Sequence, residues 1–368
     1  MTPAQDPFSM TKVPAPDARR GRGAVSNASG RYEEEARVAM DDGWGTLDQE
    51  APPLKTTITI DTTRTIIARN QSPDISFDRS INPYRGCEHG CIYCFARPTH
   101  AFLGLSPGLD FESKLFVKPD AAKLLAKELS APNYRCDVIA IGTNTDPYQP
   151  IERSNQIMRQ ILEVLAAFNH PVGIVTKSAL VTRDIDLLAP MAARKLAKVA
   201  ISVTTLDRRL ARLMEPRAAT PERRLEAIRT LNQAGVPCGV MTAPMIPGLN
   251  DQELESILEA SRDAGAAEAG YVVLRLPLEI KDLFREWLRS NYPNRADRVM
   301  SLVRQMRGGR DYDATFFKRG VGQGPVAQLI NRRFNLAVKR LGMNQRRLKL
   351  DTSQFRKPPR SGDQLALL

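Results

Sequence analysis

Long apolar runs are absent from this sequence, and so is any residue order that would direct the chain through a membrane. No stretch approaches the roughly 20 consecutive apolar residues that a helix needs to cross a bilayer. The first residues, Met-Thr-Pro-Ala-Gln, lack the basic and then apolar order of a signal peptide. We therefore expect a cytoplasmic protein with no membrane partner.

Cysteine and histidine are scarce, with five and three residues among 368. Three of the cysteines, Cys87, Cys91 and Cys94, are clustered with the spacing Cys-x3-Cys-x2-Cys, and no fourth cysteine or paired histidine follows nearby. A structural zinc site uses four donors, and an ordinary [4Fe–4S] cluster uses four thiolates. Three thiolates therefore indicate a [4Fe–4S] cluster with one iron left open, where a small molecule can coordinate. A reducing cytoplasm keeps such thiolates free for metal.

A zinc knuckle is the alternative interpretation of the same cysteines. His89 lies inside the first cysteine loop, where it is poorly placed to complete a tetrahedron around an ion held by its two flanking cysteines. His100, six residues after Cys94, is the other candidate for a fourth ligand. Such a site would indicate a non-enzymatic, nucleic-acid-associated protein.

Acidic residues are nearly missing from the last part of the chain. The net charge is +12, and between positions 332 and 360 there are ten Lys or Arg residues but one acid, Asp351. Such a segment suits contact with the phosphates of nucleic acid. The alternative is a solvated tail, because Phe334 and Phe355 are its only aromatic side chains and stacking on bases would be limited.

The chain divides into three regions by composition. Residues 1–50 are rich in Pro and Gly, offer little apolar surface, and are expected to be largely disordered. Residues 51–292 are expected to form the main domain. Residues 293–368 are expected to be a basic extension that acts as a lid or docking arm, with Gly308–Gly309 and the glycines of 320–324 as hinges.

Helix-like and strand-like segments alternate through the main domain. Short apolar runs typical of strands buried on both faces occupy 137–142, 171–176, 198–203, 238–242 and 271–274. Helices are predicted over 120–130, 153–168, 183–194, 221–234, 251–264 and 278–290. Short β segments are also predicted at 56–60 and 65–68, ahead of the cysteine loop. With one strand entering the cysteine loop, the five apolar runs make six βα units, two short of a closed barrel. The predicted fold is an α/β open partial (β/α)6 barrel.

Polar residues follow these strands at the ends where the functional loops of such a barrel emerge. Thr145 and Asp146 follow the second strand, Thr176 and Lys177 end the third, and Ser202 ends the fourth. The fifth strand leads into Ala243. In contrast, Cys136 and Cys238 stand at the starts of strands, so we expect them at the barrel floor as small buried hydrophobes.

The cysteine loop closely resembles that of the radical S-adenosylmethionine (SAM) enzymes. Residues 81–290 are similar to the spore photoproduct lyase branch of this superfamily in the cysteine spacing, Thr145–Asp146, Thr176–Lys177, Ser202, the segment from Gly235 to Pro244, and that from Glu279 to Pro293. The flanks at 21–27 and 76–85 resemble "DNA repair photolyase-like" radical SAM proteins, whose substrate is unassigned.

This resemblance implies the cofactors and a set of residues that bind them. Cys87, Cys91 and Cys94 would ligate a [4Fe–4S] cluster, and SAM would be held by Tyr93, through its main chain, and by Thr145, Asp146, Lys177, Ser202 and Ala243. One electron, from an external donor of the flavodoxin or ferredoxin type, would cleave SAM to methionine and a 5′-deoxyadenosyl radical. This radical would abstract hydrogen from an unidentified substrate, for which a nucleic-acid-related molecule is one candidate.

Two positions depart from the lyase pattern. The lyases resemble one another in having a hydrogen-donating cysteine three residues before the Asp of the second strand, and the matching residue here is Thr143. Their tyrosine after the third cluster cysteine is matched by Phe95. Because a hydroxyl O–H bond is much stronger than a thiol S–H bond, Thr143 argues against photoproduct repair by that relay. DNA photoproduct lyase activity stays an alternative function.

Overall fold

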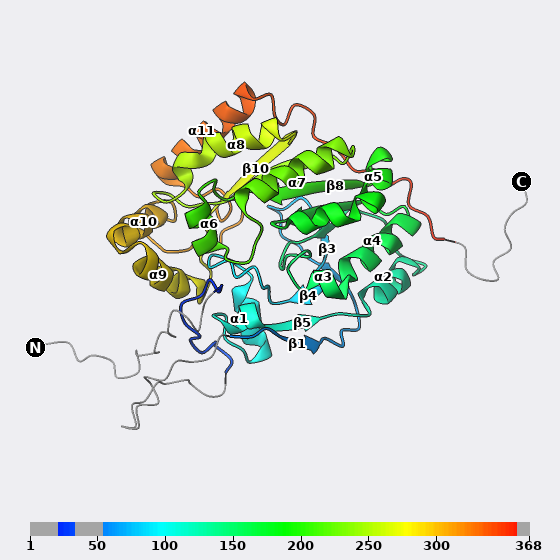
Figure 1. The fold of residues 1–368 in the computed structure, drawn as a ribbon, viewed down its shortest axis with the longest axis horizontal. Helices are drawn as coiled ribbons and strands as arrows, with labels where there is room; N and C mark the ends of the chain where they lie inside the picture. The colour runs from blue at the N-terminus through cyan, green and yellow to red at the C-terminus, as the bar shows by residue number, and fades with distance from the viewer. Residues whose placement is uncertain (1–20, 34–53, 359–368) are drawn as a thin grey trace, which may run out of the picture.

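The computed structural model of this chain describes residues 21–33 and 54–358. Their centre is a seven-stranded sheet in the order β10-β9-β8-β7-β6-β3-β2 (Figure 1). The six strands from β10 to β3 are all parallel, and β2 pairs antiparallel to β3 at the edge. The strands are β2 (Ile67–Arg69), β3 (Arg79–Ile81), β6 (Ile139–Ile141), β7 (Val172–Thr176), β8 (Ala197–Ser202), β9 (Cys238–Met245) and β10 (Glu268–Val273). The edges β10 and β2 do not pair, which confirms the predicted open (β/α)6 barrel.

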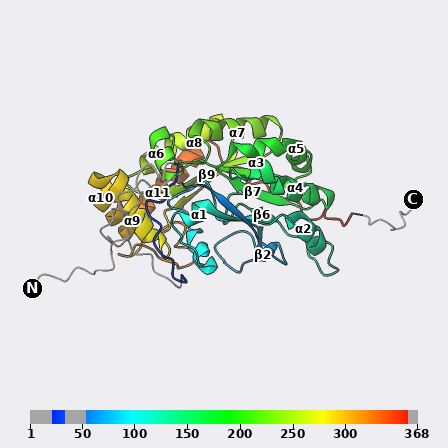
Figure 2. The same cartoon turned by 60° about the horizontal axis from the view of Figure 1, so that its bottom comes forward.

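Helices cover the outer face of this sheet (Figure 2). They correspond closely to the predicted ones: α2 (Ala121–Leu129), α3 (Glu152–Asn155), α4 (Ile157–Ala167), α5 (Ile185–Ala193), α7 (Pro221–Gln233), α8 (Leu254–Asp263) and α9 (Ile280–Asn291). Capping residues in the local sequence determine where such helices begin. In α7, for example, the Thr220 side chain accepts a hydrogen bond from the N–H of Arg223, and Pro221 occupies the first turn.

The inner face of the barrel is less buried than the outer face, which the helices cover. Along β7 and β8, residues that point outward are buried under helices, while those that point inward alternate with them and stay partly accessible. The inward residues are mostly small, and a Cβ added at Gly173 would meet no atom within 4 Å. Other small inward residues are Ala140, Ala200, Gly239, Ala243 and Gly270. The inner face of β7 and β8 is therefore partly accessible to solvent.

The first barrel strand was not located by the sequence patterns. The predicted β segment at 56–60 is β1 (Thr57–Ile60), but it lies in a second, three-stranded sheet, where it pairs with β5 (Lys114–Val117), and β5 in turn pairs with β4 (Tyr84–Arg85). The segment predicted at 65–68 is the antiparallel edge strand β2. The true first strand is β3, whose sequence Arg-Ser-Ile is short and only one-third apolar.

Part of the N-terminal region is tightly packed, so the prediction of disorder is wrong for residues 21–33. Arg22, Ala24 and Ser26 are buried there. The main-chain N–H groups of Gly23 and Ala24 each donate to the Glu112 carboxylate at 2.8 Å. Residues 1–20 and 34–50, the rest of the region predicted to be disordered, lie outside the described residues.

The C-terminal region is not a separate extension. Helices α10 (Pro293–Gln305) and α11 (Gly324–Arg340) contribute Val299, Ile330 and Phe334 to the hydrophobic cores of the barrel domain. The prediction of a boundary at residue 292 is therefore wrong, because apolar faces of both helices are buried against the barrel.

The last described residues also correct the lid prediction. They leave α11 and run past α5 toward α2 (Figure 1), along the N-terminal ends of the strands. The N–H of Leu348 donates to Glu268 at the start of β10, and the N–H of Arg356 donates to the carbonyl oxygen of Phe168, ahead of β7. We call residues 348–357 the floor strap, because they close the end of the barrel opposite the cysteine loop.

A pair of loops joins the two unpaired edges of the sheet. Arg319, in the loop 306–323 between α10 and α11, binds the carboxylate of Asp74, in the loop between β2 and β3, with distances of 2.5 and 2.7 Å. The N–H of Val273 at the end of β10 donates to the carbonyl oxygen of Gly320 in the same loop.

Among the described residues, no helix has the length and apolarity that crossing a membrane requires.

Candidate active site at the cysteine loop

The three clustered cysteines lie in a tightly turned loop that follows β4. The N–H of Gly90 donates to the carbonyl oxygen of Cys87, and the N–H of Cys94 donates to that of Cys91, both at 3.2 Å. Gly90 has a positive φ of 66°, and a Cβ there would approach Glu112 to 2.7 Å, so a glycine is required. Cys87 and Cys91 are buried, and Cys94 is partly buried.

One buried arginine holds this loop from behind. Arg97 is fully buried, and its guanidinium donates to the carbonyl oxygens of Cys91 at 2.9 Å and Gly90 at 3.2 Å. It also donates to the carbonyl oxygens of Pro107 and Gly108 and pairs with Glu112. Because Glu112 also binds the N-terminal residues 23 and 24, these three distant segments are fixed together.

The environment of the thiols tests whether they fit a metal cluster. Burial, with Asp146 and the neighbouring cysteines adding to it, holds the pKa of Cys87 well above its ordinary value, and burial with Glu215 nearby raises the pKa of Cys91. Buried thiols near carboxylates, such as those of Cys87 and Cys91, become thiolates when a strongly positive group lies among them. The donor set therefore fits a cationic metal centre.

The arrangement also bears on the zinc alternative. Among the described residues, no three His, Cys, Asp or Glu side chains converge on a point where one ion could bind. His100 Nε2 lies 2.9 Å from the carbonyl oxygen of Lys114, and His89 Nδ1 lies 3.3 Å from Asp146 Oδ2. In a cubane cluster each thiolate binds a different iron, so the sulfurs need not converge. The geometry fits a cluster better than a single zinc ion.

The predicted SAM-binding residues lie together at the C-terminal ends of the strands, next to the cysteine loop. Thr145 and Asp146 follow β6, Lys177 follows β7, and Ser202 and Ala243 lie at the end of β8 and within β9. The Lys177 ammonium lies 5.8 Å from the centre of the Tyr93 ring, which belongs to the cysteine loop. Among the described residues Lys177 pairs with no carboxylate, so its charge is available to a ligand.

Asp146 is already fully engaged within the protein. One carboxylate oxygen accepts hydrogen bonds from Thr176 Oγ1 at 2.7 Å and from the N–H of Tyr148 at 2.9 Å. The other accepts from the N–H of Lys177 at 2.7 Å and faces His89. Burial opposes ionisation, but His89, Thr176 and the Lys177 N–H outweigh it and lower the pKa of Asp146. A ribose diol would have to displace one of these partners.

Thr145 has a similar internal partner. It is buried, and its hydroxyl donates to the carbonyl oxygen of Tyr84 at 3.0 Å. Its side chain therefore ties the loop after β6 to the strand that leads into the cysteine loop.

A buried polar network behind the site was not predicted. The Tyr93 hydroxyl and the Arg224 guanidinium both bind the Glu215 carboxylate, and Thr204 Oγ1 donates to it at 2.7 Å. Arg224 also donates to the carbonyl oxygen of Ser202 at 3.0 Å. The network fixes Tyr93 and Ser202 relative to each other. Glu215 and Arg224 do not indicate this network in the sequence, because charged residues such as these are usually solvent-exposed.

The far side of the cysteine loop faces the sixth strand. The guanidinium of Arg275, just after β10, lies 4.8 Å from the centre of the Phe95 ring, directly after Cys94. The Phe95 ring is 44% exposed, and Arg275 Nη2 lies 3.4 Å from the Tyr312 hydroxyl. A partly free cation and an exposed aromatic ring thus lie beside the third cysteine, suited to a planar or anionic substrate.

The two remaining cysteines lie away from this site, as expected. Cys238 begins β9 and Cys136 precedes β6, so both are at the floor end of the barrel. Burial raises the pKa of Cys136 to about 11 and that of Cys238 to about 12, which leaves both as neutral thiols.

Comparisons with known proteins agree with this geometry. Residues 81–260 match the model of the Radical SAM superfamily. An uncharacterized protein of Mycobacterium tuberculosis strain H37Rv is 38% identical over 243 residues, which cover 65% of this chain and 72% of that protein. An uncharacterized protein of Methanocaldococcus jannaschii is 28% identical over 214 residues, 58% of this chain and 76% of the relative.

Solved structures share the fold. Spore photoproduct lyase complexed with dinucleoside spore photoproduct superposes with a TM-score of 0.56 at 16% identity, covering 78% of this chain and 80% of that one. A variant of that lyase with bound AdoMet and dinucleoside spore photoproduct gives a TM-score of 0.54 at the same coverage. The chain therefore belongs to the radical SAM superfamily, and it is a radical SAM enzyme with the fold of spore photoproduct lyase.

Proposed function

We propose that Cys87, Cys91 and Cys94 hold a [4Fe–4S] cluster whose fourth iron binds SAM. The observation that carries this proposal is a rigid loop with two buried thiols and a third, partly buried one, placed at the open end of a barrel whose inner face is partly accessible. When bound, the two cofactors supply a one-electron cleavage of SAM to methionine and a 5′-deoxyadenosyl radical, which abstracts hydrogen from a substrate.

The residues around the loop position SAM and do not take part in bond breaking. Lys177, without a carboxylate partner among the described residues, binds the methionyl carboxylate. The Tyr93 hydroxyl is used by Glu215, so Tyr93 offers its main chain to the adenine, and Ala243 offers its own from β9. Ser202 contributes from the end of β8.

Thr145 and Asp146 contribute to SAM binding indirectly. Both side chains are occupied within the protein, so we infer that they shape the loop after β6, whose main chain borders the cofactor. The small inward residues of the barrel leave room for SAM and a substrate. Arg275 and Phe95 then face the substrate.

Anaerobic reconstitution tests the proposal. The protein is treated with iron and sulfide, and iron, visible absorption and 5′-deoxyadenosine are measured after SAM and dithionite are added. We expect about four irons per chain and 5′-deoxyadenosine from the wild type, and neither from Cys91→Ser. Cys136→Ser is the matched control, because Cys136 lies at the floor end, and it should retain both. A colourless protein with bound zinc would refute the proposal.

DNA photoproduct lyase activity is a second candidate, supported by the fold that this chain shares with spore photoproduct lyase. Thr143 counts against it, since it follows β6 at the position where the lyases place a hydrogen-donating thiol. Incubating the reconstituted protein with photoproduct-containing DNA decides the question. SAM cleavage without any loss of photoproduct would eliminate this candidate and leave the radical SAM chemistry intact.

A nucleic-acid-related substrate rests on the basic C-terminal segment. Within it, Arg333 pairs with Glu255 and Arg340 with Glu259, both on α8, so part of its charge is neutralised internally. The cations at 346, 347, 349, 356 and 357 lie in or next to the floor strap, at the opposite end of the barrel from the cysteines. We therefore propose that nucleic acid, if it is the substrate, contacts both the cysteine-loop end and the floor-strap end of the barrel. Comparing oligonucleotide binding by Arg346→Glu/Arg347→Glu and by the wild type tests the contact at the floor-strap end.

A further inference from the structure

An arginine-rich cavity of about 910 Å³ opens directly beside the cysteine loop. It lies between the loops that follow β6 and β7 and the segment that follows α6 (Arg208–Met214), and His89 of the cysteine loop forms part of its wall. No Asp or Glu of the described residues 21–33 and 54–358 lines it. Four arginines do: Arg153, Arg183, Arg217 and Arg223.

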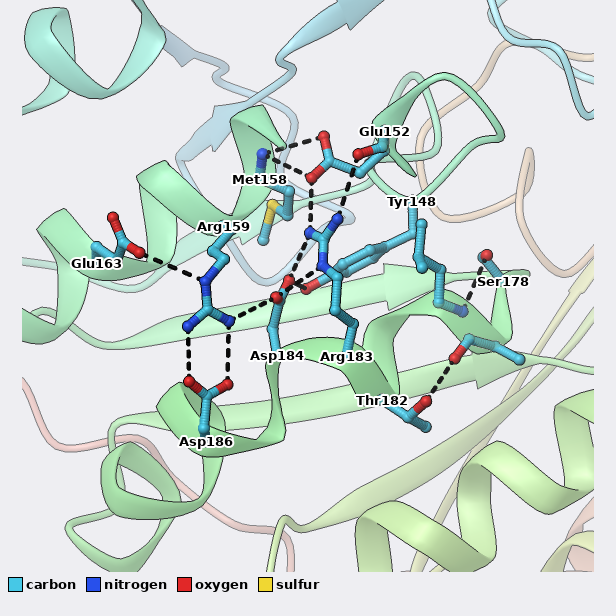
Figure 3. Close-up of polar contacts among 12 residues, drawn as sticks. Tyr148, Glu152, Met158, Arg159, Glu163, Ser178, Thr182, Arg183, Asp184 and Asp186 are labelled. Atoms are coloured by element: carbon cyan, nitrogen blue, oxygen red, sulfur yellow. Dashed lines mark hydrogen bonds and ion pairs between the residues drawn. The ribbon is translucent and has the colours of Figure 1, made fainter. Parts of the chain in front are cut away.

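Figure 3 shows the wall of this cavity that is formed by the segment after β7. Arg183 Nη2 lies 2.7 Å from Glu152 and 2.9 Å from Asp184, so its charge is balanced from behind. The polar groups of Ser178 and Thr182 are used by hydrogen bonds within their own segment. This wall is therefore rigid and contributes little free charge.

The other arginines give the cavity its positive charge. Arg217 is 38% exposed and pairs with one carboxylate, that of Glu88, at 2.6 Å. Arg153 and Arg223 are exposed, and neither has a carboxylate partner among the described residues. Two uncompensated guanidinium groups thus stand at the mouth of the cavity, where they attract an anionic partner over a distance of about one Debye length.

The cavity is connected directly to the cysteine loop. The N–H of Arg217 donates to the carbonyl oxygen of His89 at 3.3 Å, and its side chain binds Glu88. His89 and Glu88 lie between Cys87 and Cys91. A partner seated in the cavity would therefore contact the residues that separate two of the cysteines.

We propose that this cavity docks an acidic one-electron carrier protein of the ferredoxin or flavodoxin class. This inference rests on the proposed function, because SAM cleavage consumes one electron that the chain itself does not supply. In the transfer, the reduced carrier loses one electron to the metal centre held by the cysteines, and no bond or proton is exchanged. Cys87 and Cys91 are buried, so the donor must approach closely, and the cavity provides that approach.

A nucleic acid would also be attracted by arginines, but the cavity offers it little else. Tyr148, the one tyrosine that lines it within the described part of the chain, is buried with its hydroxyl bound to Asp184, so this ring is not presented for base stacking. Charge without stacking favours the acidic surface of a protein.

The test is a charge reversal at the mouth of the cavity, Arg153→Glu/Arg223→Glu. Arg223 lies in the first turn of α7, where an acidic side chain is favourable, so the variant should fold. The control is Arg298→Glu, an exposed arginine on α10. The Kd for purified flavodoxin and for purified ferredoxin is measured at low and high ionic strength, with and without the reconstituted cluster.

We expect the double variant to weaken binding of at least one carrier by about ten-fold or more at low ionic strength, and the control to leave the Kd unchanged. 5′-Deoxyadenosine formation with dithionite should be normal in both variants. Wild type that binds neither carrier, or a double variant with wild-type Kd, would overturn the docking proposal. A selective loss of single-stranded oligonucleotide binding would overturn it in favour of nucleic acid. If wild type fails to cleave SAM with dithionite, the proposed function fails separately, and the Kd comparison still stands.

Discussion

Asp146, at the end of the second barrel strand, faces His89 of the cysteine loop across 3.3 Å. The same carboxylate accepts hydrogen bonds from Thr176 and from the N–H of Lys177 at the end of the third strand. Asp146 therefore connects the cysteine loop to two strand ends, including the one that presents Lys177. The positions of His89 and of the Lys177 main chain both depend on this one side chain.

Replacing Asp146 by Asn should disrupt this connection. The Asn amide has one acceptor oxygen, and its NH2 group would face N–H and O–H groups that are themselves donors. We therefore expect the free energy of unfolding to fall by about 3 kcal/mol. Urea denaturation measures this loss, and iron content after reconstitution should also fall. An Asp146→Asn protein with wild-type stability and iron content would contradict the role assigned to this carboxylate.

Arg97→Lys tests the support behind the cysteines. A lysine has one nitrogen and cannot make the hydrogen bonds to four carbonyl oxygens and a carboxylate that Arg97 makes, so the buried Glu112 keeps its main-chain donors but loses its close charged partner. We expect a loss of about 3 kcal/mol in the free energy of unfolding, together with poor iron incorporation. The matched change at exposed Arg298 should cost less than about 0.5 kcal/mol, and equal effects at both positions would argue against the interpretation.

The alternating pattern of the barrel was predictable because its signals are local. The strand at 171–176 was recognised from a short apolar run bounded by turns, and the start of α7 from Thr220 and Pro221. The buried hydrogen bonds that hold the cysteine loop in place were not predictable from such local patterns, because they join residues far apart in the sequence. Arg22 donates to the carbonyl oxygen of Glu112, 90 residues away, and nothing in the sequence around Arg22 indicates such a partner.

The same reasoning explains the error at the C-terminus. The charge of residues 332–360 suggested a solvated arm, yet charge describes only the outward face of α11. Its inward face carries Ile330 and Phe334, which are buried. Apolar residues at helical spacing within a basic segment were the signal that could have been used.

His170 should make stability depend on pH at the barrel floor. Burial lowers the pKa of His170 to about 4, and its ring nitrogens are bound to the Tyr134 hydroxyl and the carbonyl oxygen of Pro171. The unfolded chain, with a His pKa of about 6.5, binds the proton first as the pH falls. Stability is therefore complete above pH 6.5 and declines by roughly 3 kcal/mol down to pH 4. Unfolding free energies of wild type and His170→Gln, compared across this range, should diverge at high pH and converge at low pH.

Phe355→Ala tests the floor strap. The Phe355 ring packs against Tyr134, Phe168 and His170, with ring centres 5.5 to 6.2 Å apart. Removing it should lower the free energy of unfolding by about 2 kcal/mol and increase hydrogen exchange in residues 348–357. Phe317→Ala, at a ring that is 67% exposed, should change stability by less than about 0.5 kcal/mol. No difference between the two variants would show that the strap is not held by this ring.

The floor strap has a consequence for biosynthesis. Residues 348–357 supply the last contacts at the base of strands that are made much earlier, so the barrel stays incomplete until residue 357 has left the ribosome. The cysteine loop is synthesised more than 250 residues before that point. Insertion of the proposed metal centre is therefore expected only after residue 357 has emerged and the barrel is complete.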